Sequence, residues 1–169
     1  MKALIVSDSH GLTMELQILK DRHQHEVDIM LHCGDSELAI TSKEMSGFSG
    51  VRGNCDYDSN YPNDMPIPFG GKQILLTHGH LYNVKMTLMN LRYRAEEVGA
   101  NIVCFGHSHI ADAELIDNIL FINPGSIRLP KMRKERTYAI LEIINNEAIV
   151  TYYDLDGNSV DQLTLRTSL

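Results

Sequence analysis

The sequence predicts an α/β (α+β) fold in which two β-sheets pack face to face, with helices on the outside. In the first part of the chain, short apolar strands alternate with helical or loop segments, which is typical of parallel strands joined by crossovers. From residue 113 onward, strands are joined by short polar turns, which is typical of antiparallel hairpins. A chain of 169 residues suits one domain, and we expect residues 1–169 to fold as a single unit.

Composition indicates a protein of a reducing compartment. The three cysteines are odd in number and widely spaced, so no disulfide framework is expected. No signal-length apolar segment follows a basic start, and no apolar run approaches the roughly 20 residues of a membrane helix. We therefore expect a cytoplasmic protein that makes no membrane contact. The net charge of −7 argues against broad nucleic acid binding, because such binding depends on Lys and Arg neutralising phosphates.

The elements of the first part follow from apolar runs and their boundaries. The opening apolar run Ala3–Val6 reads as a strand buried on both faces, and Thr13 is placed to cap the helix that follows it. In chain order we expect a strand over 3–6, a helix over 12–22, strands over 27–31 and 48–51 with a short helix at 37–45 between them, and a loop over 57–68.

The second part contains one further helix and several hairpins. Gly70-Gly71 and Asp117-Asn118 mark tight turns, and Gly99 closes an amphipathic, methionine-rich helix that we interpret as core packing. In chain order we expect a hairpin at 68–73, a strand over 74–77, a helix over 86–98, a strand over 102–105, a hairpin over 113–122, and strands over 138–144, 148–153 and 160–165.

Five of the apolar strands end in residues of the types that bind metals. These are Asp8 with His10, Asp35, Asn54, His78 with His80, and His107 with His109. Any one of them alone is more typical of a turn or of a hydrogen-bonded core residue. Because ligands of open α/β sheets collect at the carboxyl ends of the strands, their recurrence favours one shared site. His32 precedes Gly34-Asp35 and is a weaker candidate for this site. His23 and His25 lie in a polar stretch that we assign to the surface.

This ligand set has the chemistry of a two-metal centre. Oxygen and imidazole ligands without thiolate pairs suit divalent Mn, Fe, Ni or Zn. Seven or eight candidates are too many for one ion. Carboxylates can bridge two ions about 3.5–4 Å apart, an arrangement that clamps the attacking and leaving oxygens in phosphoryl transfer.

The motifs resemble those of the calcineurin-like metallophosphoesterase superfamily. They are Asp8-x-His10, Gly34-Asp35, Gly53-Asn54, His78 and Gly106-His107-x-His109. Arg52-Gly53-Asn54-Cys55-Asp56 and Asn123-Pro124-Gly125-Ser126 are most similar to the small bacterial and archaeal phosphodiesterase branch. The resemblance extends to about Ser126. It implies a four-layer α-β-β-α sandwich, in which two mixed sheets lie between helices.

The resemblance also implies roles for the ligands. It assigns Asp8, His10 and His109 to one ion, Asn54, His78 and His107 to the other, and Asp35 to both. Two divalent ions are implied, with Mn expected and Ni, Fe or Zn as alternatives. A hydroxide shared by the ions would attack a small phosphodiester, with Asp35, Asn54 and His78 at the catalytic centre. Two such ions would also supply the local positive charge that the acidic surface lacks.

The pattern departs from the wider superfamily after Asn54. Many members have His at the next position, where it acts as a cation or proton donor near the leaving oxygen. This chain has Cys55 there. A thiol is a poor general acid, and we hypothesise that leaving-group protonation is weak. His80 is a further catalytic candidate. The alternative is that it is a surface residue without a role in the site. Arg52 and Ser126 are candidate substrate contacts.

Two other functions remain open at this stage. A scaffold or protein-interaction module is the first, because a eukaryotic relative, a retromer subunit, has this fold and serves mainly in assembly. The completeness of the ligand set distinguishes the two, since that relative has lost ligands that are present here. A nuclease would need a basic groove or a capping domain, which neither charge nor length offers. Exposed hairpin edges would allow a homodimer.

Overall fold

The computed structural model describes residues 1–169. In chain order, the elements are β1 (Lys2–Val6), α1 (Met14–His23), β2 (Ile29–His32), β3 (Phe48–Gly50), β4 (Asp64–Phe69), β5 (Lys72–Thr77), η1 (His80–Tyr82), α2 (Met89–Glu97), β6 (Ile102–Cys104), β7 (Asp112–Ile116), β8 (Ile119–Asn123), β9 (Thr137–Ile144), β10 (Glu147–Asp154), η2 (Asp161–Leu163) and β11 (Leu165–Ser168). Here η denotes a 3₁₀ helix.

The strands form two mixed sheets. The first has the order β11-β10-β9-β1-β2-β3, and the second has the order β4-β5-β6-β8-β7. In the first sheet β1 pairs parallel to β2 and antiparallel to β9. In the second, β5, β6 and β8 are parallel, while β4 and β7 pair antiparallel at the two edges. The predicted change from parallel strands to hairpins is confirmed.

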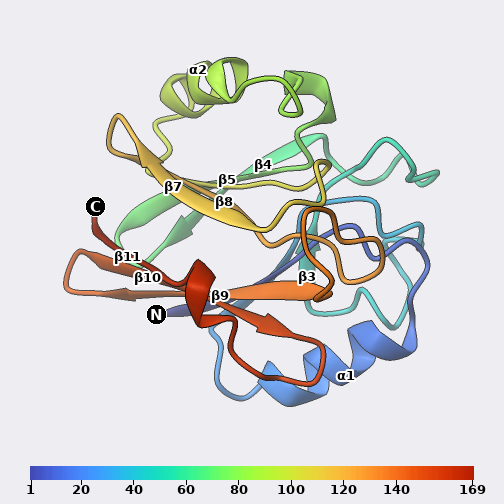
Figure 1. Cartoon of the computed structure of the whole chain (residues 1–169). Coiled ribbons are helices and arrows are strands. Elements are labelled where there is room, and N and C mark those ends of the chain that lie inside the picture. Colours follow the sequence, from blue (N-terminus) through green and yellow to red (C-terminus); the bar gives the residue numbers. More distant parts are fainter.

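The two sheets stack face to face, and one helix covers each outer face (Figure 1). Side chains of both sheets share one core cluster, which includes Ile5, Leu76, Ile122 and Leu141. The outer face of the first sheet packs against α1, and that of the second packs against α2. The predicted four-layer α-β-β-α sandwich is therefore confirmed.

Strand β1 shows how the sequence produces these layers. Successive side chains of a strand point to opposite faces. Ala3 and Ile5 accordingly enter the core between the sheets, whereas Leu4 and Val6 pack toward α1. All four side chains are fully buried, which explains the continuous apolar run.

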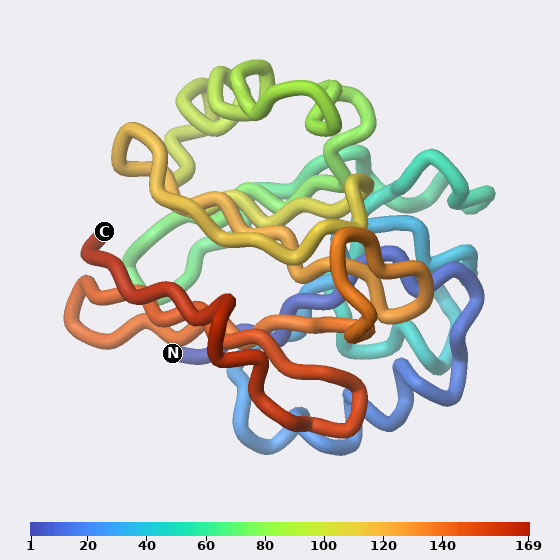
Figure 2. Tube along the Cα trace, viewed as in Figure 1, coloured from blue at the N-terminus to red at the C-terminus, as the bar shows by residue number.

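The loops that follow β1, β2, β3, β5 and β6 lie at one end of the sandwich, and both chain termini lie toward the other end (Figure 2). Parallel pairing of these strands within each sheet produces this polarity. The predicted ligand-type residues therefore arrive together, as the strand-end argument expects.

The predicted helix at 37–45 is wrong. The segment forms successive turns, because its first residues bind elsewhere. The backbone N–H of Glu37 donates to Asp56 Oδ1 at 2.7 Å, and that of Ile40 donates to Asp58 Oδ2 at 2.9 Å. Glu37 also has a left-handed backbone (φ 55°), which a right-handed helix excludes.

The predicted loop over 57–68 is also wrong at its end, because β4 occupies Asp64–Phe69. Its prolines argued against a strand. Pro66 and Pro68 are exposed, and β4 is an edge strand, where a missing N–H donor is tolerated. The turn at Gly70-Gly71 is confirmed, and both glycines have positive φ values, 58° and 76°.

Other boundaries differ more modestly. Helix α1 begins after Thr13, but the Thr13 side chain makes no capping hydrogen bond. Helix α2 begins at Met89, and Met86 and Met89 are exposed, so the core-packing interpretation of these methionines is wrong. The last strand lies at Leu165–Ser168, and η2 occupies part of the range predicted for it. None of the helices combines the length and apolar character required to cross a membrane.

Replacing Leu4 by Ala tests the contribution of β1 to the fold. Its side chain is 0% exposed against α1, so we expect the substitution to lower the free energy of unfolding by about 3 kcal/mol. Urea denaturation measures this. The matched control is Leu115→Ala on edge strand β7, where the side chain is 39% exposed. Equal losses in the two variants would contradict the assignment of Leu4 to the core.

Candidate metal centre

The backbone at the strand ends adopts an unusual conformation. Five of the predicted ligands have φ values in the left-handed region: Asp8 (52°), His10 (44°), Asp35 (54°), His107 (66°) and His109 (61°). Such residues are uncommon outside glycine and cluster at functional sites. The left-handed turn directs these side chains across the end of the sandwich.

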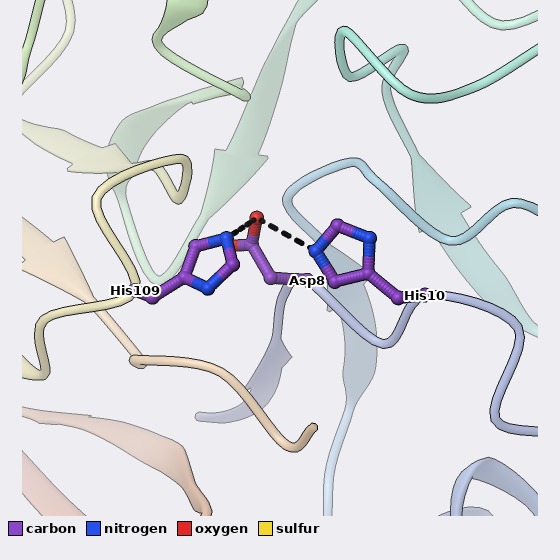
Figure 3. A group of neighbouring side chains, drawn as sticks. All are labelled: Asp8, His10 and His109. Atoms are coloured by element: carbon purple, nitrogen blue, oxygen red, sulfur yellow. Dashed lines mark ion pairs between the residues drawn. The ribbon is translucent and has the colours of Figure 1, made fainter. Parts of the chain in front are cut away.

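Asp8 lies at the centre of the first group of ligands. Its Oδ1 atom is 3.1 Å from His109 Nε2 and 3.9 Å from His10 Nε2 (Figure 3). The carboxylate is fully buried. Ser7 Oγ donates to its other oxygen at 2.6 Å, and the backbone N–H of His107 donates to that oxygen at 3.1 Å. One oxygen is therefore held by donors, and the other faces the two imidazoles.

His78 joins this group to the second one. Its Nε2 atom lies 3.9 Å from Asp8 Oδ1 and 3.3 Å from Asp35 Oδ2. The same nitrogen lies 3.2 Å from Asn54 Oδ1. Three oxygen atoms from three different loops thus surround one ring nitrogen.

Backbone carbonyls and a carboxylate orient the three imidazoles. The Nδ1 atoms of His78 and His109 lie 2.7 Å from Cys33 O and 2.8 Å from Leu129 O. The Nδ1 atom of His10 lies 2.7 Å from Glu37 Oε1. An acceptor at Nδ1 requires the ring to carry its proton there, which leaves the Nε2 electron pair free. All three Nε2 atoms face the carboxylate oxygens described above.

This arrangement attracts positive charge. Burial disfavours the charged form of His78, but the carboxylates of Asp35 and Asp8 outweigh burial and raise its pKa. The adjacent carboxylate of Asp8 likewise raises the pKa of His109. Burial raises the pKa of Asp8, but His109 and His78 more than reverse this effect and lower it overall. The centre therefore favours ionised carboxylates with a cation between them.

The donor set fits divalent metal ions. Asp8 Oδ1 and His10 Nε2 are buried without any hydrogen-bond partner, and such atoms are rare in proteins. Three groups of side chains each place their ligand atoms within 4.8 Å of one another: Asp8, His10 and His109; Asp8, Asp35 and His78; and His10, Asp35 and Cys55. The groups share members, so the candidate sites for an ion adjoin one another.

Two predicted ligands lie at the margin of these groups. The His107 ring packs edge-on against His78, with centroids 5.1 Å apart, but it belongs to none of the three groups. Burial, together with the positive charges of His78 and Lys85, lowers the pKa of His107 to about 4. Asn54 is exposed, and its oxygen reaches the centre only through His78.

A model of the calcineurin-like phosphoesterase superfamily domain matches residues 1–146. The chain belongs to this family.

Two relatives of this phosphoesterase are informative. The Bacillus subtilis (strain 168) protein named "Probable metallophosphoesterase YsnB" is 49% identical over 169 residues, which cover 100% of both chains. Phosphodiesterase YfcE of Escherichia coli (strain K12) is 30% identical over 100 residues, which cover 54% of this chain and 50% of YfcE. The resemblance predicted from the motifs is confirmed, and the chain is a metallophosphoesterase of this small branch.

Solved structures agree with this assignment. A predicted phosphoesterase from Streptococcus pneumoniae TIGR4 superposes with a TM-score of 0.95 and 35% identity, covering 99% of this chain and 97% of that chain. Vps29 of Entamoeba histolytica, solved in complex with Zn²⁺, superposes with a TM-score of 0.76 and 22% identity, covering 99% of each chain. At that identity, the likeness to Vps29 shows the fold alone.

Asp56 organises the loop that carries Asp35 in this phosphoesterase. Its carboxylate accepts hydrogen bonds from the backbone N–H groups of Asp35 (2.8 Å), Glu37 (2.7 Å) and Gly53 (2.7 Å). Ser36 Oγ donates to it at 3.1 Å. Asp56 therefore supports the predicted ligand Asp35 through the backbone of its loop.

Glu37 is the site residue that sequence reasoning missed. Its contact with His10 places a carboxylate behind a predicted ligand, an arrangement that fixes ring orientation and raises ligand basicity. Glu37 was assigned to a helix that does not form. Only its position two residues after Asp35 could have pointed to it.

The glycines of two motifs permit close contact between loops. A Cβ atom on Gly53 would lie 2.0 Å from Asp35 Oδ1, and one on Gly106 would lie 2.0 Å from Ser7 Oγ. Real Cβ atoms essentially never approach that closely. The motifs Gly53-Asn54 and Gly106-His107 therefore require glycine, because neighbouring loops meet there without space for a side chain.

The candidate substrate contacts have different environments. The His80 ring lies near His78 and His107, and its Nδ1 is buried without a partner. Arg52 is half-buried, and its Nε lies 3.5 Å from Asp56 O. Ser126 is fully buried, and its hydroxyl donates to Asp8 O at 2.8 Å while accepting two backbone N–H groups. The structure thus favours a supporting role for Ser126 over the predicted substrate contact.

Cys55 is close to the centre but is not activated. Its backbone N–H donates to Asp35 Oδ1 at 2.7 Å. Burial, together with the negative charge of Asp35, raises the pKa of the Cys55 thiol to about 11. The thiol is therefore protonated at neutral pH and is a weak acid.

Two of the remaining histidines are buried, and neither belongs to the three groups of candidate ligands. His23 is bonded to Tyr138 at 2.8 Å, so its assignment to the surface is wrong. His32 accepts the backbone N–H of Gly34 at Nδ1, so its Nε2 proton points to Ser9 Oγ at 2.9 Å. His32 thereby ties the loop of Asp8 and His10 to the loop of Asp35.

The neutral form of His32 predicts a pH dependence of stability. Burial lowers its pKa from 6.5 to about 4. Between these values the unfolded chain binds more protons than the folded chain, so stability falls as the pH falls from 6.5 to 4. At about 1.4 kcal/mol per pH unit, this loss approaches about 3 kcal/mol.

Urea denaturation at pH 7 and pH 4.5 measures this loss. We expect His32→Gln to lose less stability on acidification than the wild type, and His25→Gln, at an exposed position, to behave as wild type. An NMR titration of the His32 ring in the wild-type protein gives a second measure. A ring that titrates near pH 6.5 would contradict the prediction.

Proposed function

We propose that this chain is a dinuclear-metal phosphodiesterase that hydrolyses small phosphodiesters. The observation that carries the proposal is the buried Asp8 Oδ1, which has no hydrogen-bond partner and lies within 3.9 Å of His10, His78 and His109. An ionised oxygen enclosed by imidazoles requires a cation. The name of the relative YfcE supports a diester as the substrate class.

The ligands divide between two ions as the family pattern implies. Asp8, His10 and His109 would hold one ion, and Asn54, His78 and His107 the other, with Asp35 shared. The ligand groups that meet at Asp8, Asp35 and His10 support two adjoining sites. A mixture of carboxylate and imidazole ligands suits Mn, which we expect, with Ni, Fe and Zn as alternatives.

The bound ions would activate water and neutralise charge on the phosphoryl group. The protein's own part is to hold the ligands in place before substrate arrives. Asp56 fixes the loop of Asp35, Glu37 fixes the ring of His10, and Ser126 fixes the backbone of Asp8. Such support lowers the reorganisation needed during reaction.

Two alternatives are weaker. A scaffold without catalysis has no need for strained backbone or oriented imidazoles, and here five ligand positions have left-handed φ values. A nuclease would need a basic surface, which a net charge of −7 does not favour. A homodimer and a cytoplasmic location stay predictions.

The test combines elemental analysis with kinetics. We expect about two divalent ions per chain, and hydrolysis of an aryl phosphodiester at a higher kcat/KM than the matching monoester. Asp35→Asn removes a charge between the two ion sites, and we expect it to lower kcat/KM at least about 100-fold. Asp156→Asn, at an exposed position, is the matched control.

Three results bear on this prediction. Chelation with EDTA should abolish activity, and Mn²⁺ should restore it. Fewer than two ions in the wild type, together with an unchanged rate in Asp35→Asn, would overturn the proposal.

Cys55 predicts how the rate depends on the leaving group. A thiol with a pKa of about 11 protonates the leaving oxygen poorly, so diesters with acidic leaving groups should react much faster than alkyl diesters. A series of aryl diesters of increasing leaving-group pKa measures the slope. We expect Cys55→His to make this slope shallower, because imidazole is a better proton donor. A flat dependence in the wild type would refute weak protonation.

A further inference from the structure

A groove of about 300 Å³ opens beside the metal centre. Ser108, which lies between His107 and His109 in the chain, lines it, so one loop borders both sites. The groove contains none of the predicted ligands. It lies at the outer end of the second sheet, between the segment before α2 and strand β7. Apolar side chains contribute much of its lining, among them Val84, Leu88 and Ile110.

Two lysines line the groove. The backbone N–H of Lys131 donates to His109 O at 3.0 Å, so Lys131 adjoins the ligand loop directly. Lys85 lines the same groove from the segment before α2. The flank of the groove that meets the loop of His107 and His109 therefore carries positive charge for a phosphate at the metal centre.

Two carboxylates line the groove, and Glu114 lies farther from the ligand loop than Asp112 does. Asp112 and Glu114 are two residues apart on β7 and share a face. Asp112 pairs with Asn123, at the end of β8 near the ligand loop, whereas Glu114 pairs with Phe121, further from that end. The two lysines and the two carboxylates of the groove form no ion pair within the chain. All four side chains are therefore available to a ligand.

We propose that this groove binds one ester arm of the diester substrate, and that this arm is uncharged, bears a ring, and carries hydroxyl or amino donors at its far end. The inference rests on the proposed function, because it needs a phosphate at the metal centre. The apolar lining contacts the ring, the lysines lie beside the phosphate, and Asp112 and Glu114 accept the distal donors.

Size and charge both select this arm. Small-molecule pockets measure about 300–1,000 Å³, so the groove accommodates a group no larger than about a nucleoside. An arm that ends in a second phosphate would meet Asp112 and Glu114, and repulsion between like charges would weaken its binding. The groove therefore discriminates among diesters by the distal charge of one arm.

The test uses three diesters that share a p-nitrophenyl leaving group. Their other arms are methyl, thymidine attached through its 5′ oxygen, and the same thymidine with a 3′-phosphate. For the wild type we expect kcat/KM to be about 10-fold higher for the thymidine diester than for the methyl diester, and lower again for the 3′-phosphorylated one.

Two variants probe the two halves of the groove. Leu88→Trp narrows the apolar part, and we expect the thymidine-to-methyl ratio of kcat/KM to fall about 10-fold. Glu114→Gln removes the distal negative charge, and we expect the penalty for the 3′-phosphate to shrink about threefold. Leu115→Trp, on the same strand as Glu114 but outside the groove, is the control for both ratios.

The outcomes separate the two proposals. If the wild type hydrolyses none of the diesters, the proposed function fails. If it hydrolyses the methyl diester but shows a thymidine-to-methyl ratio near one that neither variant changes, the groove proposal is overturned and the proposed function stands. If Leu88→Trp fails to fold, the nearly isosteric Glu114→Gln still tests the groove proposal.

Discussion

The structure depends on a buried carboxylate that lacks a hydrogen-bond donor on one oxygen. Asp8 follows β1, in which Ala3–Val6 are fully buried, and its Oδ1 faces three imidazoles whose Nδ1 atoms are hydrogen-bonded to other groups. An ionised oxygen in such surroundings is strongly unfavourable unless a cation occupies the space. Five loops from both sheets converge there, and the left-handed turns that bring them together have no other evident compensation.

A second layer of contacts keeps this convergence in place. Asp56 binds three backbone N–H groups, His32 joins two ligand loops through Ser9 and Gly34, and Gly53 and Gly106 allow loops to meet without side chains between them. These groups are buried and hydrogen-bonded, so they hold the ligands rigidly. Rigid support of this kind is what a site requires when its chemistry consists of positioning and charge stabilisation.

The arrangement also resolves the contrast between an acidic protein and an anionic substrate. The net charge of −7 belongs to the whole chain, whereas Lys85 and Lys131 line the groove beside the loop of His107 and His109. Because exposed charges are screened beyond about 10 Å, the local groups govern binding. The proposed selectivity of the groove rests on the carboxylates of β7.

The sequence by itself determined most of the strands, the four-layer architecture and the family, because buried strands are continuous apolar runs and their polar ends recur in a specific order. It identified every side chain that surrounds Asp8 Oδ1. It could not assign Glu37, His32 or the supporting role of Ser126, because these roles depend on contacts between loops distant in the chain. The false helix at 37–45 and the missed strand β4 have the same origin, since Asp56 and the edge position, not local propensity, decided those segments. Only the tertiary structure brought Lys85, Glu114 and Lys131 into one groove, since nothing in their spacing relates them.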